Sequence, residues 1–222
     1  MDTLQTIILI LVVAYFIANM SFLKKTITSE SNANKKKKEN FRKSFPTHIK
    51  RNSMIQLLLE KIVFDLKGTK AYVLQYHNGG ESAFGIPFAK LSMTNEYCPV
   101  GIDRELPMYQ NLPLSIWAPL SLAANKNNFL CIPDVCSVTD GAASTFIGRG
   151  VKSAYIEHIT SIEGDPLGLI VFESMSGLCL DSEAVDHFRC LCAKICGLIM
   201  CKDVSMDDCT NKECEYNAPE QS

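Results

Sequence analysis

Polar residues gather where one predicted strand ends and the next begins. Ala71 to Tyr76 is rich in aromatic and β-branched residues, which is typical of a strand. The following Asn78-Gly79-Gly80 contains residue types that adopt positive φ at little cost, so we expect the chain to turn there. The connecting loop would then carry His77, Asn78, Glu81 and Phe84. These side chains could bind a small molecule; alternatively, His77 and Asn78 only make the hydrogen bonds of the turn.

Catalytic motifs are missing from the sequence. It contains no G-x-S-x-G elbow, no phosphate-binding Walker loop and no H-E-x-x-H pair. Glu157 and His158 are adjacent in a predicted strand, so their side chains should point to opposite faces and not act together. We therefore expect a protein that is not an enzyme and has no catalytic residues.

The cysteines are the other residues with chemical potential. The chain has ten, six of them between Cys190 and Cys214. Cys192 and Cys196 share a face of a predicted helix, but the C-x2-C pairs that are typical of zinc sites do not occur. We expect no metal site and mostly reduced, buried, cytosolic thiols. A structural metal and a redox-sensing thiol remain the alternatives.

A long uncharged segment lies near the N-terminus. Leu4 to Leu23 contains no charged residue and is long enough to cross a bilayer as a helix. A cleaved signal peptide is the alternative. Only Asp2 carries a charge ahead of the segment, and Ala18-Asn19-Met20 is a poor cleavage site. The segment predicts a transmembrane anchor over residues 1–23.

A basic segment follows the predicted anchor. Residues 24–51 contain ten Lys and Arg against two Glu, a net charge of +8, and few large apolar residues. Basic residues beside a span stay on the cytoplasmic side, so the rest of the chain should be cytoplasmic. The segment is either a contact for anionic lipid or only a topology signal. Residues 52–222 are acidic, with twelve basic and twenty-one acidic residues, which argues against nucleic acid as a partner.

The remaining pattern predicts one α+β domain. Hydrophobic spacing and turn residues indicate, in order, a helix, two strands, a helix, a strand, a helix, two strands and a helix. The predicted ranges are 53–66, 71–76, 89–96, 115–124, 129–132, 140–147, 153–161, 167–173 and 182–200. We expect four parts: a transmembrane anchor (1–23), a basic disordered linker (24–51), a folded domain (52–201) and an acidic disordered tail (202–222).

This order of elements resembles a GAF domain. The helix before AYVLQYHNGG, the strand GVKSAYIEHIT, the strand DPLGLIVFES and the closing helix carry the resemblance. Its most specific parts are Gly150-Val151-Lys152-Ser153 and Pro166-Leu167-Gly168-Leu169-Ile170. The resemblance implies a mostly antiparallel sheet with flanking helices. It also implies either a small ligand between the sheet and the crossover helices or a dimerising scaffold without a ligand.

If that pocket is occupied, the resemblance implies which residues would line it. The candidate ligand-binding residues are His77, Asn78, Glu96, Trp117, Asp134 and Glu157, with Tyr76 and Phe88 as further apolar walls. The sequence lacks the Asn-Lys-Phe-Asp-Glu pattern of cyclic-nucleotide GAF domains and a Cys-His pair placed for a bilin. The cofactor therefore stays unassigned.

Two functions fit these features. The first is a membrane-anchored GAF-like sensory or regulatory binding module, without catalytic activity, in the cytoplasmic or host inner membrane. Its partners would be lipid, a small ligand, and a second copy or a regulatory protein. The alternative is a phage lysis protein, because the layout resembles T-even phage holins, which have one N-terminal span and a globular signal-receiving domain. Those holins expose that domain to the periplasm, whereas the basic flank here predicts a cytoplasmic domain.

Overall fold

The computed structural model describes residues 35, 39, 42, 44–81, 87–138 and 141–200. The described residues from 51 onward belong to one compact unit. The predicted anchor and the predicted acidic tail lie outside the described residues and remain predictions. Within the described part of the chain, no helix combines the length and the hydropathy that a membrane span requires.

The domain is built on one six-stranded sheet in which every pair of neighbouring strands is antiparallel. The strand order is β3-β2-β1-β6-β5-β4. The strands are β1 (Lys70–Glu81), β2 (Pro87–Tyr97), β3 (Leu112–Pro113), β4 (Phe129–Ile132), β5 (Ser153–Thr160) and β6 (Pro166–Ser174). The predicted α+β fold with a mostly antiparallel sheet is confirmed, and β3 is the strand that the sequence pattern did not indicate.

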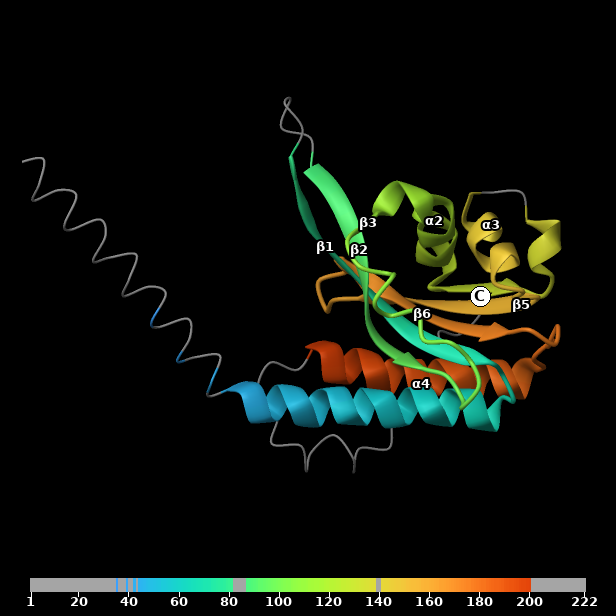
Figure 1. Cartoon of the computed structure of the whole chain (residues 1–222), viewed down its shortest axis with the longest axis horizontal. Helices are drawn as coiled ribbons and strands as arrows, with labels where there is room; N and C mark the ends of the chain where they lie inside the picture. The colour runs from blue at the N-terminus through green and yellow to red at the C-terminus, as the bar shows by residue number, and fades with distance from the viewer. Residues whose placement is uncertain are drawn as a thin grey trace, which may run out of the picture. The chain divides into compact units, whose positions relative to one another are not determined.

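Helices cover both faces of the sheet (Figure 1). The helix of residues 51–65 and α4 (Ser182–Met200) lie side by side on one face, where Asp65 accepts a hydrogen bond from His187 at 2.8 Å. The opposite face carries α2 (Ala118–Asn127) and α3 (Gly141–Gly148). Two short 3-10 helices, η1 (Leu114–Ile116) and η2 (Val135–Ser137), belong to the connections.

The alternation of side chains along the strands produces two separate cores. Under α2 and α3 the buried side chains include Tyr72, Leu74, Trp117, Phe146 and Val171. Under the other two helices they include Leu59, Val73, Tyr155, Phe172 and Phe188. Because neighbours such as Tyr72 and Val73 point to opposite faces, each strand contributes to both cores. The sheet is therefore buried on both sides, as in a three-layer domain.

The turn predicted at Asn78-Gly79-Gly80 does not exist. Strand β1 continues to Glu81, and Asn78 pairs with Ala89 of β2. The register shifts between Asn78 and Glu81, and Gly80 has a φ of 110°. Gly80 therefore allows a local irregularity in the pairing of β1 with β2, and the chain does not reverse its direction there. The segment that joins β1 to β2, including Phe84, lies outside the described residues.

The first helix also departs from its predicted bounds. Residues 44–50, which the composition assigned to the linker, are helical and continuous with 51–65. At its other end the helix ends at residue 65, and Lys67 in the turn that follows has a φ of 55°. Gly68 comes next, and a side chain would not fit there because a Cβ would lie 1.9 Å from the Phe172 ring.

The cysteines are less buried than the sequence predicted. All seven that the structure describes are free, but only two are buried. Four are exposed: Cys131, Cys136, Cys179 and Cys190. Apolar neighbours in the sequence did not indicate burial, because adjacent side chains in a strand, such as Cys131 in β4, or in a helix, such as Cys190 in α4, point in different directions. Among the described residues, no group of three or more His, Cys, Asp or Glu side chains could hold a metal ion.

Gly168 explains one motif of the GAF resemblance. It lies in the middle of β6 between Gln75 of β1 and Ile159 of β5. A Cβ at this position would lie 2.0 Å from the carbonyl oxygen of Leu74. Backbone atoms of a paired strand cannot move aside without breaking the ladder, so only glycine fits here.

We expect Gly168→Ala to lower the free energy of unfolding by on the order of 3 kcal/mol, because it forces β1 and β6 apart. The matched control is Gly197→Ala in α4, where an added Cβ meets nothing within 4 Å. That change should raise stability by up to ~1 kcal/mol through helix propensity. Urea unfolding of both variants measures the difference, and equal stabilities would contradict the close approach at Gly168.

Candidate ligand site

The structure does not bring the six predicted ligand-binding residues together. His77 lies in β1, where its Nε2 is 2.8 Å from Oγ of Ser92. Strand alternation points it to the face opposite Tyr76. Asn78 is exposed and belongs to the β1–β2 ladder. These two residues therefore lie in a strand and not in a turn, and their binding of a ligand stays a prediction.

The other four predicted residues are spread over the domain. Glu96 is buried in a charge network and Trp117 is fully buried in the core under α2. Asp134 is an exposed N-cap whose Oδ1 accepts a hydrogen bond from the Cys136 amide at 3.0 Å. Glu157 faces α4, with Oε2 3.4 Å from Nε of Arg189. Only Glu96 and Trp117 lie on the face that α2 and α3 cover.

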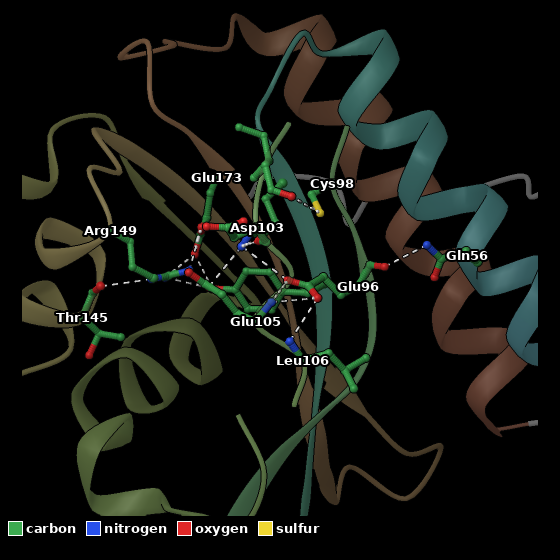
Figure 2. A network of polar contacts seen from close by, with 12 residues as sticks. Gln56, Glu96, Cys98, Asp103, Glu105, Leu106, Thr145, Arg149 and Glu173 are labelled. Atoms are coloured by element: carbon green, nitrogen blue, oxygen red, sulfur yellow. Dashed lines mark hydrogen bonds and ion pairs between the residues drawn. The ribbon is translucent and has the colours of Figure 1, made fainter. Parts of the chain in front are cut away.

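The charge network is centred on Arg149 and Glu173 (Figure 2). Arg149 follows α3, and its Nη1 and Nη2 donate to the two carboxylate oxygens of Glu173 on β6, at 3.1 and 2.6 Å. The Tyr72 hydroxyl on β1 donates to the same carboxylate. Arg149 also donates from Nε to the carbonyl of Thr145 at 3.1 Å. The guanidinium therefore joins the end of α3 to the two central strands of the sheet.

Lys70 and Glu105 extend the network to the β2–β3 connection. Nζ of Lys70 lies 3.3 Å from Glu96 and 3.1 Å from Glu105, and Glu105 lies 2.7 Å from Arg149. Glu96 also accepts hydrogen bonds from the backbone amides of Glu105 and Leu106, at 2.9 and 3.0 Å. These contacts fix the connection between β2 and β3 against the end of the sheet.

Burial and neighbouring charges together shift the pKa values of the groups in this network. Burial raises the pKa of Glu173, and Arg149 and Tyr72 oppose that shift. Burial acts to lower the pKa of Arg149, but Tyr72 and Glu173 outweigh it and raise the pKa, so Arg149 stays charged. The arrangement holds two cations and three carboxylates in a region that excludes water. It is an ionic lock that joins the end of α3 and the β2–β3 connection to the sheet, so we assign it a positioning role.

Of the five charged residues in this network, only Glu96 was predicted from the sequence as a functional residue. The other four are Lys70, Glu105, Arg149 and Glu173. A signal was present, because Lys70 and Glu173 are charged residues next to the apolar runs Ala71–Leu74 and Leu167–Phe172. The motif beginning at Gly150 was also informative. Gly150 has a φ of 75° and ends α3, which places Arg149 at the last turn.

A second group of polar atoms lies between α2 and the sheet. The side chains of Tyr76 on β1 and Ser121 on α2 interact with each other, but neither hydroxyl, nor Nδ1 of His158 on β5, makes a well-aligned hydrogen bond within the described residues. The rings of Tyr76 and His158 are 6.2 Å apart between centroids. Nε1 of Trp117 is also buried and unpartnered, one helical turn before Ser121. Buried polar groups in folded proteins are almost always well hydrogen-bonded, so we take this face as the candidate site for a polar molecule.

The four side chains of this group are uncharged at neutral pH. Burial raises the pKa of Tyr76, with Ser121 opposing the shift, and burial lowers the pKa of His158. Tyr76 and His158 are therefore uncharged at neutral pH, and Trp117 and Ser121 do not titrate. All four side chains can donate a hydrogen bond, and all but Trp117 can accept one. We call Tyr76, Trp117, Ser121 and His158 the α2 site.

Comparison with known proteins identifies the fold. No protein-family model matches the sequence, and no curated protein is detectably similar to it. Among solved structures, the domain is similar to the phycocyanobilin-bound GAF domain of a cyanobacterial phytochrome. The TM-score is 0.55 at 12% identity, and the match covers 72% of this chain and 90% of that one.

Two further structures agree with this result. The PixJ GAF domain of Thermosynechococcus elongatus has a TM-score of 0.53 at 12% identity, covering 68% of this chain and 84% of that one. A bacteriophytochrome from R. palustris has a TM-score of 0.52 at 13% identity, covering 72% of this chain and 37% of that one. At such identities the likeness shows the fold alone. The chain contains a GAF-like domain, as the sequence resemblance predicted.

We expect Arg149→Met to lower the free energy of unfolding by about 3 to 5 kcal/mol, because it leaves the buried Glu173 carboxylate without its cation. The double variant Arg149→Met/Glu173→Gln should recover part of that loss. Lys152→Met is the matched control, since Lys152 is exposed beside the same motif, and it should cost less than ~0.5 kcal/mol. Chemical denaturation measures all three. A single variant as stable as the control would contradict the network.

Proposed function

We propose that the chain is a membrane-tethered GAF-like regulatory module that binds a small uncharged ligand at the α2 site and has no catalytic activity of its own. The observation that carries the proposal is the set of four buried polar atoms on the face covered by α2 that make no well-aligned hydrogen bond within the described residues. The similar GAF domain named above is bound to phycocyanobilin, which makes ligand binding a reasonable expectation for this fold.

A ligand smaller than a bilin fits this face better. Trp117, Phe146 and Tyr72 are fully buried there. Trp117 makes edge-to-face contacts with Phe146 and Tyr109, at centroid distances of 5.6 and 6.5 Å. Such an aromatic cluster fills space that a tetrapyrrole would need and stabilises the core by packing. The α2 site therefore favours a compact ligand with several hydrogen-bond acceptors.

The tether rests on the sequence. The uncharged segment Leu4 to Leu23 supports a membrane span, and the basic residues that follow it support a cytoplasmic domain. In this arrangement the domain would sense a soluble ligand near the membrane. Its output would pass to a second copy or to a regulatory protein partner.

The full-length chain tests the proposal in one preparation. We expect the protein in the membrane fraction, and after detergent extraction native mass spectrometry should show a mass above that of the chain, corresponding to a small bound molecule. Ser121→Leu, which fills the α2 site, should lose that added mass. Leu122→Ala is the control, since Leu122 is exposed on the neighbouring face of α2.

A ligand recovered from the wild-type protein should raise the free energy of unfolding of the wild type by about 2.7 kcal/mol at a hundredfold excess over the dissociation constant. The same ligand should leave the free energy of unfolding of Ser121→Leu unchanged. Recovery from the soluble fraction would contradict the tether. A native mass equal to that of the chain, with no thermal shift against uncharged metabolites, would contradict the ligand.

A further inference from the structure

A cavity of about 300 Å³ lies at the edge of the sheet, and His158 of the α2 site is among the residues that line it. It forms where β5 extends beyond β4: Phe129, the first residue of β4, pairs with Glu157, and Thr160 lies past that pair. One face of α4 forms the opposite wall with Arg189, Ala193, Cys196 and Met200. Asn128, at the end of α2, lines the rim.

Two opposite charges in this cavity have unused hydrogen-bonding atoms. Oε2 of Glu157 and Nε of Arg189 are 3.4 Å apart, close enough for an ion pair. Both atoms are nevertheless buried, and neither makes a hydrogen bond within the described residues. The Arg189 guanidinium lies over the Phe129 ring at 5.7 Å, which holds its direction. A buried charged group without a hydrogen bond is costly, so both atoms can gain from a third partner.

Apart from Arg189, the wall formed by α4 is apolar. Ala193, Cys196 and Met200 carry no formal charge, because burial and the nearby Glu157 raise the pKa of the Cys196 thiol to about 12. Glu157 itself is partly desolvated: its side chain is 13% exposed, and burial raises its pKa to about 7, with Arg189 opposing the shift. A cationic ligand group beside Glu157 would oppose that shift further.

We propose that this cavity binds a small zwitterion, an α-amino acid with an apolar side chain. Its ammonium group would donate to Glu157, its carboxylate would accept from Arg189, and its side chain would lie against Ala193, Cys196 and Met200. A ligand with one charge would be attracted by one partner and repelled by the other, whereas a zwitterion matches both. The volume is at the lower end of ligand cavities, which suits an amino acid.

This site goes beyond the proposed function, although His158 lines the cavity and also belongs to the α2 site. The Glu157 side chain faces α4, whereas the His158 ring lies beside Tyr76 on the opposite face of the sheet. Glu157 and Arg189, which would bind the two charged groups of an amino acid, are not members of the α2 site.

Isothermal titration of the detergent-solubilised full-length chain tests the proposal with three probes: L-leucine, N-acetyl-L-leucine and L-leucine methyl ester. We expect L-leucine to bind, and each blocked derivative to bind at least tenfold more weakly because it lacks one charge. Absence of leucine binding, or equal affinity for N-acetyl-L-leucine, would overturn the proposal without any variant.

Two substitutions locate the site. Glu157→Gln and Arg189→Gln should each weaken leucine binding at least tenfold, while Glu163→Gln, an exposed residue of the β5–β6 hairpin, should leave it unchanged. Circular dichroism confirms that each variant is folded. Wild-type affinity in a folded Glu157→Gln or Arg189→Gln variant would place the binding elsewhere and overturn the assignment.

Discussion

The buried ion pair between Arg149 and Glu173 is the interaction on which the arrangement of the layers depends. It contacts β1 through Tyr72, β6 through Glu173, and the β2–β3 connection through Glu105. Desolvating these charges is costly, and a well-packed apolar substitute could be as stable. The value of the pair is positional, because a bidentate contact fixes direction as well as distance. It joins the residue that follows α3 to the central strands of the sheet.

The two faces of the sheet differ in chemistry as a result. The face under residues 51–65 and α4 has an apolar core that includes Val73, Phe172 and Phe188, and the Glu157–Arg189 pair lies on this face at the edge of the sheet. The other face contains both the ionic lock and the polar atoms of the α2 site. Apart from the Glu157–Arg189 pair, ordinary core packing accounts for the first face. The second contains polar groups that packing alone would not select, which is why we place the regulatory site there.

Much of the fold was predictable because hydrophobic periodicity is a local signal. The strand at Phe129 and the helix ending at Met200 match their predicted bounds. The site was not predictable, because it depends on contacts between distant residues: Arg149 and Glu173 are 24 positions apart, and Tyr72 and Glu173 are 101 apart. The sequence Asn78-Gly79-Gly80 is typical of a turn, but in the structure Asn78 pairs with Ala89 in the sheet, so tertiary pairing overrides the local preference. The sequence indicated Glu96 as a functional residue and predicted that it binds a ligand, whereas in the structure it belongs to the charge network with Lys70.

The central claim is that the α2 site holds a polar molecule. A crystal structure of the chain at a resolution that shows ordered waters tests it most directly. We predict electron density for a ligand or ordered water within hydrogen-bond distance of Ser121 Oγ, Tyr76 Oη and His158 Nδ1. A structure in which these three atoms bond only to one another or to other protein groups, with no further density between α2 and the sheet, would contradict the account.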